Sequence, residues 1–215
     1  MALAGCASDY YDYCYDCAPP TPYAMILSDP TFDGDITRDP VTGSYTIAQG
    51  ETESVFVGVE PATGAESRAF LDFPLRGTVG VPADAVIETA TIDMGIITII
   101  PQPFVGTIPI RIDLVSFQPP TLAGTDFDRT RRPALATTTI TPPISQADFN
   151  NHRVIDVTSL LIEAQRRGLA DFQIRIMRDS EPVSSGLIEI SDTTGENRMG
   201  VAPLLQVTYF IFPRG

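Results

Sequence analysis

Acidic side chains are the most numerous groups in this sequence that could do chemistry. The chain has 27 aspartates and glutamates but only one histidine, and it lacks the Gly-x-Ser-x-Gly and phosphate-binding glycine motifs. Two carboxyl groups about 5 to 10 Å apart can hydrolyse a glycoside. The candidates for such a pair are Glu163, Asp171, Glu181, Glu189, Asp192 and Glu196. Because 27 acidic residues bring some pair to that spacing by chance, we expect a non-catalytic protein, not an enzyme.

The three cysteines all lie near the N-terminus. Residues 3–6, Leu-Ala-Gly-Cys, resemble the lipobox of bacterial lipoproteins, which implies lipidation of Cys6 and a signal segment encoded upstream; otherwise they are ordinary small N-terminal residues. Lipidation would leave Cys14 and Cys17 as an even pair, which we expect to form a local disulfide or to remain as thiols. A redox or zinc role would need a thioredoxin-like context or two more ligands, and the sequence offers neither.

The first 22 residues are predicted to form a tether. Tyrosine and aspartate dominate residues 8–17, and three prolines in residues 18–22 favour an extended course. So many tyrosines indicate a segment that packs on its own domain, on a neighbouring subunit or on a carbohydrate. The alternative is a solvated spacer. We therefore expect residues 1–22 to be a tether and residues 23–215 to be a single domain.

Four aspartates after the tether raise the possibility of bound calcium. They lie in a loop rich in glycine and proline and are Asp29, Asp33, Asp35 and Asp39. Their spacing does not match an EF-hand, and aspartates in such loops commonly stabilise turns. We expect no cofactor, with calcium at this loop as the exception.

Charge and composition exclude several classes of partner. The chain has 215 residues and a formal net charge of −13, and all 14 of its basic residues are arginine. A protein that binds nucleic acid through phosphates gains affinity from clustered positive charge, so nucleic acid is not an expected partner. No apolar run reaches the length of a membrane-spanning helix, so we expect membrane contact through a lipid anchor only.

One short helix is predicted at about residues 157–167. Asp156 precedes it as an N-cap, Gly168 follows it as a left-handed C-cap, and Leu160, Leu161 and Ala164 form its apolar stripe. An apolar stripe on a single helix must pack on a sheet, because the other periodic segments alternate with period two.

Eight to ten strands are predicted around this helix. In residues 68–75 and 108–117 the apolar positions alternate with polar ones, so Arg68, Asp72, Arg111 and Asp113 are expected on the outer side. Residues that we expect in the core are Leu71, Phe73, Ile92, Ile112, Leu160, Ile174 and Val207. This pattern indicates an all-β fold, an antiparallel two-sheet β-sandwich of jelly-roll type.

Four segments in order resemble the motifs of the DNRLRE domain family. They are residues 66–73 (ESRAFLDF), 81–92 (VPADAVIETATI), 156–160 (DVTSL) and 203–209 (PLLQVTY). The resemblance covers about residues 50–210 and implies a β-sandwich of extracellular or cell-wall proteins, similar to carbohydrate-binding modules. The chain has no tryptophan, and Ala164-Gln165 stands where the family usually carries one.

These observations lead to two expected functions at the cell envelope or outside the cell. The first is a lipid-anchored carbohydrate-binding module, in which aromatic platforms and a basic loop hold an acidic polysaccharide. Its expected ligand residues are Tyr45, Phe56, Phe104, Phe127, Arg129, Arg131 and Arg132. The second is a structural or assembly subunit of a surface layer or filament, in which the tether binds a neighbouring surface protein.

Overall fold

The structure is a computed structural model, and it describes residues 22–77, 80–116, 121–179 and 185–211. The strands in these ranges are β1 (Tyr23–Leu27), β2 (Gly34–Arg38), β3 (Tyr45–Gln49), β4 (Ser54–Val59), β5 (Glu66–Pro74), β6 (Val86–Ile100), β7 (Thr107–Ile108), β8 (Ile110–Val115), β9 (Ala136–Thr139), β10 (Ile144–Ser145), β11 (Asn151–Asp156), β12 (Asp171–Arg178), β13 (Leu187–Ser191) and β14 (Leu204–Phe210). The helices are α1 (Gly124–Phe127), α2 (Thr158–Arg166) and α3 (Arg198–Val201), with a 3-10 turn η1 (Gln146–Asp148).

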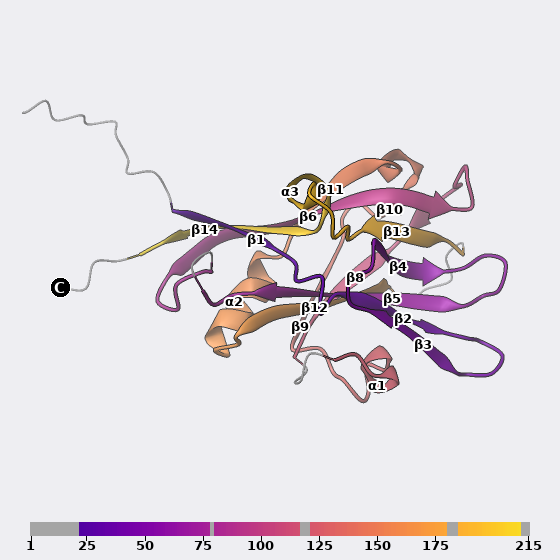
Figure 1. Cartoon of the computed structure of the whole chain (residues 1–215), viewed down its shortest axis with the longest axis horizontal. Coiled ribbons are helices and arrows are strands. Elements are labelled where there is room, and N and C mark those ends of the chain that lie inside the picture. The colour runs from indigo at the N-terminus through magenta and orange to yellow at the C-terminus, as the bar shows by residue number, and fades with distance from the viewer. Residues whose placement is uncertain (1–21, 78–79, 117–120, 180–184, 212–215) are drawn as a thin grey trace, which may run out of the picture.

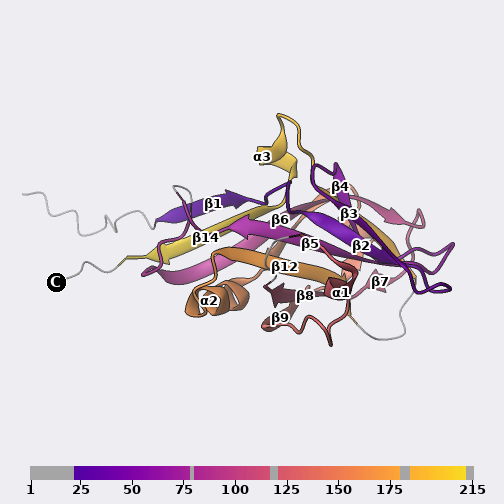
Figure 2. The same ribbon diagram turned by 60° about the horizontal axis from the view of Figure 1, so that its bottom comes forward.

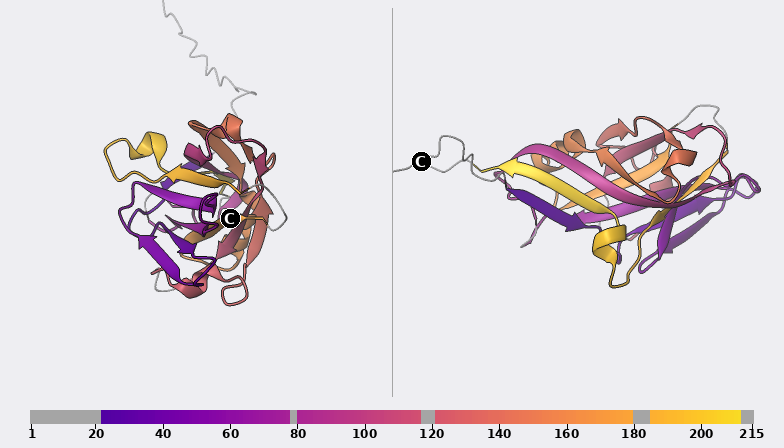
Figure 3. Two further views of the ribbon diagram at one scale, coloured as in Figure 1. Left: turned by 90° about the vertical axis from the view of Figure 1, so that its right-hand side faces the viewer. Right: turned by 90° about the horizontal axis from the view of Figure 1, so that it is seen from above.

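The strands form a sandwich-like all-β fold, as predicted (Figure 1). One layer contains β1, β14, β6 and β11, and the other contains β3, β2, β5, β12, β8 and β9; every pairing is antiparallel. The layers are not two separate sheets, because β13 pairs with β6 while β4 pairs with both β13 and β5. The hydrogen-bonded sheet therefore folds over on itself, and the end-on view in Figure 3 shows strands all around the core.

The space between the layers is an apolar core. All seven residues expected there are buried, with 0 or 1% of their surface exposed. They belong to one large cluster that also contains the inward residues of β13 and α2. Alternation of apolar residues therefore predicted the inner face of each long strand correctly.

Helix α2 has the predicted place and ends. Its apolar side chains Leu160, Leu161 and Ala164 are buried, and it contacts β6 in one layer and β9 and β12 in the other (Figure 2). Asp156 acts one residue earlier than a conventional N-cap: its Oδ1 accepts a hydrogen bond from the Thr158 amide at 2.8 Å. Gly168 follows with φ +68°, a left-handed conformation that favours glycine.

Several sequence predictions about the fold are wrong. The described residues form fourteen strands, not eight to ten, and two further helices are present, α1 after β8 and α3 after β13. Asp72 and Asp113 are not on a wet face, since 3% and 0% of their surfaces are exposed. Near Asp113 the outer face is covered by the segment that contains α1, whose Leu122 and Phe127 pack with Phe70. Asp72 instead contacts Gln173 and the segment before β2. Alternation cannot reveal such a cover, because it lies in an irregular segment.

The predicted turn-rich loop at residues 28–35 also ends in a strand. Gly34 begins β2, where a Cβ atom would lie only 2.2 Å from the Ala48 carbonyl oxygen of β3. The close approach of β2 and β3 therefore requires glycine at this position.

The described ranges contain no helix with the length and apolar character that a membrane span needs.

Candidate ligand-binding site

A pocket of about 450 Å³ opens on the outer face of the layer that contains β2, β5, β12 and β8. Its lining includes the five arginines Arg38, Arg68, Arg111, Arg129 and Arg178, against two aspartates, Asp128 and Asp179. Five of the 14 basic residues of a chain with net charge −13 thus meet at one place. We call this site the arginine pocket.

Strand register explains why these side chains meet. Arg38 at the end of β2 lies opposite Tyr45 at the start of β3. Met177 of β12 lies opposite Arg111 of β8, while Arg178 is the last residue of β12 and lies opposite Ile110. Residues opposite one another on neighbouring strands project from the same face with Cβ atoms about 4.5 to 5.5 Å apart. The antiparallel order therefore gathers residues that are far apart in the sequence.

A stack of three side chains forms one wall of the arginine pocket. The Arg68 guanidinium lies 3.9 Å from the centroid of the Phe127 ring and donates hydrogen bonds to the Phe127 carbonyl oxygen and to Glu66. The rings of Tyr45 and Phe127 are tilted, with centroids 5.4 Å apart. Phe127 is 4% exposed and Tyr45 is 43% exposed, so Tyr45 offers the aromatic surface to a ligand and Phe127 supports it.

Other arginines of the pocket have donors to spare. Among the described residues, the side chains of Arg38 and Arg178 have neither a hydrogen bond nor an ion pair, and Arg38 is exposed. Arg111 pairs with Asp179 at 2.5 Å, but its buried Nε has no acceptor in the described ranges. The guanidinium groups of Arg38 and Arg178 can therefore bind an anionic group that enters from solvent.

A buried ion network lies beneath the pocket. Asp113 Oδ2 accepts from Arg175 Nη2 at 2.7 Å and from Arg129 Nε at 3.0 Å, while Asp113 Oδ1 accepts from the Thr137 hydroxyl at 2.8 Å. Burial lowers the pKa of Arg175 from its ordinary value, and its hydrogen bond to Asp113 opposes that shift. Arg175 Nη1 also donates to the Asp126 and Arg132 carbonyl oxygens at 2.8 and 3.1 Å. The network therefore anchors the α1 segment and positions Arg129.

The structure places some of the predicted ligand residues in the arginine pocket and others outside it. Tyr45, Phe127 and Arg129 meet in the arginine pocket. Arg132 is tied inward, with Nε 2.9 Å from Asp126 Oδ1 and Nη1 3.2 Å from the Ser116 carbonyl oxygen, and Arg131 is exposed outside the pocket.

The two other predicted aromatics lie elsewhere. Phe104 is a core residue with 5% of its surface exposed, and Phe56 is half-buried in β4. Four arginines of the pocket, Arg38, Arg68, Arg111 and Arg178, were not among the predicted ligand residues. Two of them, Arg68 and Arg111, occupy outward polar positions of predicted strands, a signal that would have suggested a shared charged face.

The four aspartates considered for calcium serve the backbone or are buried. Asp29 accepts from the Thr31 amide at 2.9 Å, and Asp39 accepts from the Val41 and Thr42 amides at 2.7 and 2.8 Å, as in ordinary turns. Within the described ranges, no three His, Cys, Asp or Glu residues are grouped so that they could hold a metal ion. Cys6, Cys14 and Cys17, which include the predicted lipidation site and disulfide, lie outside the described residues.

One of these aspartates, Asp33, forms a buried carboxyl pair with Asp192. Asp33 and Asp192 are both 0% exposed and interact by a side-chain hydrogen bond. Burial, together with the neighbouring Asp192 charge, raises the pKa of Asp33 well above its ordinary value, and burial raises the pKa of Asp192 to about 6. Asp33 Oδ1 accepts from the Asp72 amide at 2.7 Å, so the pair joins β2 and β5 to the segment after β13.

No family model matches the chain, and no curated protein matches it. The resemblance to the DNRLRE domain family therefore stays a prediction from its four motifs.

Proposed function

We propose that the protein is a non-catalytic binding module whose arginine pocket holds an acidic saccharide. The observation that carries the proposal is the meeting of five arginines beside the half-exposed ring of Tyr45 in a strongly acidic chain. A carboxylate or sulfate accepts paired hydrogen bonds from guanidinium groups, and the apolar face of a sugar ring packs on an aromatic side chain. Arg38 and Arg178 would bind the anionic group while Tyr45 contacts the ring.

The charge of the whole protein favours a small anionic epitope over a long polyanionic duplex. Outside the pocket, acidic groups dominate the chain and would repel an extended phosphate backbone. A saccharide residue of single charge needs only the local field of the pocket. The charge distribution therefore favours a saccharide over nucleic acid as the ligand.

The acids beside the pocket support binding over hydrolysis. Asp128 accepts hydrogen bonds from the Thr130 amide and hydroxyl, which lower its pKa, and Asp179 is paired with Arg111. Glycoside hydrolysis needs a carboxylic acid that stays protonated near neutral pH. The lowered pKa of Asp128 makes it a poor general acid, and the carboxylate of Asp179 is occupied by its ion pair with Arg111.

Calorimetric titration with an acidic and a neutral oligosaccharide tests the proposal. The full chain should bind glucuronate oligomers and not uncharged glucose oligomers. Arg38→Gln should weaken binding about tenfold or more, because a hydrogen bond to a charged group contributes about 1.5 to 3 kcal/mol. Arg131→Gln is the matched control, since it removes an exposed arginine outside the pocket. Equal effects of the two substitutions, or binding of the neutral oligomer alone, would contradict the proposal.

We propose further that the module is held at the cell envelope by a lipid on Cys6. The support is the Leu-Ala-Gly-Cys segment at residues 3–6 and the tether after it. The net charge of −13 would repel an anionic leaflet, so the acyl chains would hold the protein without a basic patch. Mass measurement of the native N-terminus tests this: an unmodified Cys6 thiol on protein recovered without detergent would contradict it.

A second candidate function, assembly with a neighbouring surface protein, is favoured by strand β1. Among the described strands, β1 pairs with β14 alone, which leaves its other edge open (Figure 1). Tyr23 and Met25 on β1 are 70% and 39% exposed, and Phe210 at the end of β14 is 42% exposed. An open edge beside apolar side chains can pair with a strand of another chain. Sedimentation of the full chain should then show a Met25→Lys substitution reducing self-association.

A further inference from the structure

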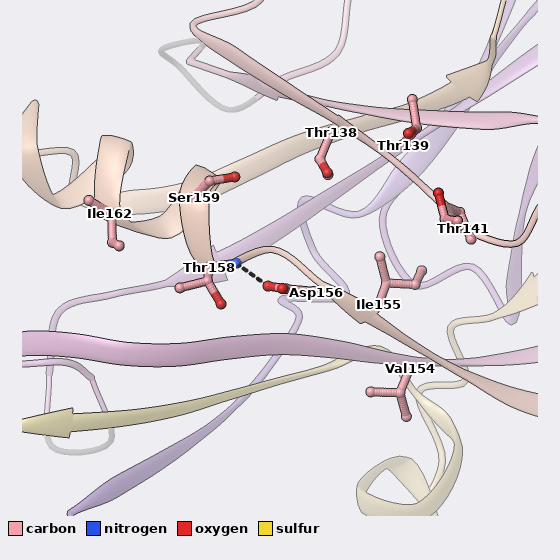
Figure 4. A pocket seen from close by; sticks show the side chains of 10 residues that line it. Thr138, Thr139, Thr141, Val154, Ile155, Asp156, Thr158, Ser159 and Ile162 are labelled. Atoms are coloured by element: carbon pink, nitrogen blue, oxygen red, sulfur yellow. Dashed lines mark hydrogen bonds between the residues drawn. The ribbon is translucent and has the colours of Figure 1, made fainter.

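A second pocket, of about 430 Å³, lies between two sheet edges at the start of α2. Figure 4 shows its three sides: Thr138, Thr139 and Thr141 from β9 and the residues after it, Val154, Ile155 and Asp156 from β11, and Thr158, Ser159 and Ile162 from α2. Strand β9 pairs with β8 alone and β11 with β6 alone among the described strands. We call this site the hydroxyl groove.

Unused hydroxyl groups and exposed apolar side chains lie together in the groove. In the described part of the chain, the hydroxyls of Thr138, Thr139, Thr141 and Ser159 have no hydrogen-bond partner. Val154 and Ile162 are 60% and 44% exposed. Hydroxyls that both donate and accept, set beside apolar surface, match the mixed polar and apolar character of an uncharged sugar ring.

The charge of the groove is opposite to that of the arginine pocket. Its one charged side chain is Asp156, whose Oδ1 is held 2.8 Å from the Thr158 amide. Hydrogen bonds from the Thr158 side chain and amide lower the pKa of Asp156, so its carboxylate stays ionised. Among the described residues, no arginine lines the groove to offset this charge. A second carboxylate in the groove would therefore be repelled.

The two pockets are neighbours across one strand pair. Thr139 lines the hydroxyl groove, Arg111 lines the arginine pocket, and the two residues lie directly opposite each other in the β8–β9 register. Opposite residues have Cβ atoms about 4.5 to 5.5 Å apart on the same face. A chain that leaves the arginine pocket past Arg111 thus reaches the groove at Thr139.

We infer that the hydroxyl groove is a second subsite for the saccharide chain held in the arginine pocket, and that it takes an uncharged sugar residue and rejects an acidic one through Asp156. This inference rests on the proposed function. The preferred ligand is then a polysaccharide in which acidic and uncharged residues alternate, and not a polyuronate. Thr139 and Ser159 would bind the hydroxyls of the uncharged residue.

The test compares three ligands by calorimetry with the full chain: an acidic disaccharide, a hexamer that alternates glucuronate and N-acetylglucosamine, and a hexamer of galacturonate. The alternating hexamer should bind about tenfold tighter than the uronate hexamer, a difference of about 1.4 kcal/mol. Asp156→Asn, which keeps a side-chain acceptor for the Thr158 amide, should remove most of this difference by strengthening binding of the uronate hexamer.

Two further variants distinguish the contribution of the hydroxyl groove to binding from that of the arginine pocket. The double variant Thr139→Val and Ser159→Ala should weaken the alternating hexamer and leave the disaccharide unchanged. Thr46→Val, at an exposed threonine of β3 outside both pockets, is the control and should change neither.

The outcomes distinguish the two proposals. If the disaccharide binds but the wild-type chain does not discriminate between the hexamers, the groove inference is overturned and the proposed function stands. If no acidic saccharide binds, both are overturned.

Discussion

The two faces of the layer formed by β5, β12 and β8 are both buried, but different forces hold them. The inner face is apolar and packs against the other layer through residues such as Leu71 and Ile174. The outer face buries the ion pair of Asp113 and Arg175, both 0% exposed at the side chain, beneath the α1 segment. Loss of one apolar group removes its burial and leaves a cavity, whereas loss of one member of a buried ion pair also leaves the other charge unpaired. The outer face therefore gives the arginine pocket a fixed geometry that depends on single residues.

The largest expected effect follows from removal of one member of the buried ion pair. Asp113→Ala should lower the free energy of unfolding by about 4 kcal/mol, because it leaves the Arg175 guanidinium buried without a counterion. Urea denaturation measures this loss. The double variant Asp113→Leu and Arg175→Met should recover most of it, and failure to recover would show that the network has another role in stability.

Truncation of a core side chain on the inner face should lower the free energy of unfolding by somewhat less than Asp113→Ala does. Leu71→Ala should lower the free energy of unfolding by about 3 kcal/mol, through lost apolar burial and the cavity that remains. Its effect should be independent of ionic strength and should leave Arg129 in place. If Leu71→Ala abolished saccharide binding in protein that stays folded, the two faces would not be separable as described.

The buried pair Asp33 and Asp192 differs from Asp113, because its two carboxyls contact each other and its nearest arginine, Arg198, lies 4.0 Å from Asp192. Their pKa values are raised above the ordinary value of 3.8, that of Asp192 to about 6. The folded state thus binds protons more tightly than the unfolded state, so the pair's stabilisation is complete below about pH 4 and is lost as pH rises through about 6.

Replacement of Asp33 tests this pH dependence. Asp33→Asn keeps an acceptor for the Asp72 amide and adds a permanent donor toward Asp192. The variant should be more stable than wild type by about 2 kcal/mol at pH 7 and should lose less stability between pH 4 and 7. Chemical denaturation at several pH values measures both. Equal slopes for the two proteins would contradict the assignment of a raised pKa to this pair.

The smallest expected effect is at the helix start, far from either buried charge. Asp156→Ala should cost about 1 kcal/mol with the fold retained, because the Thr158 amide loses its side-chain acceptor. Thermal unfolding followed by circular dichroism measures the change. A loss as large as that of Asp113→Ala would mean that exposed and buried carboxylates do not differ as argued.

The sequence predicted what periodicity encodes. Strand β5 lies within two residues of the predicted strand 68–75, and α2 lies within a residue of its predicted ends, because apolar repeats and terminal cap residues are local signals. The burial of Asp113 and Arg175 could not be predicted from periodicity, because both occupy polar, outward positions of their strands. They are buried by a segment that contacts the sheet through residues distant in sequence.

The site was predictable only in part for the same reason. Tyr45, Phe127 and Arg129 could be singled out by residue type, since aromatics and clustered arginines in loops commonly bind ligands. The order of β2, β5, β12 and β8 was needed to bring Arg38 and Arg178 to the same pocket. Phe104 shows the converse, because residue type alone does not distinguish an exposed platform from a core residue.

Mapping of backbone amide NMR shifts during titration with a glucuronate oligomer locates the bound ligand on the protein. We expect saturable changes concentrated at Arg38, Tyr45, Phe127 and Arg129, with little change on the outer face of β1 and β14. Changes centred on β1 and β14, or no saturable change at all, would contradict an acidic-saccharide site in the arginine pocket.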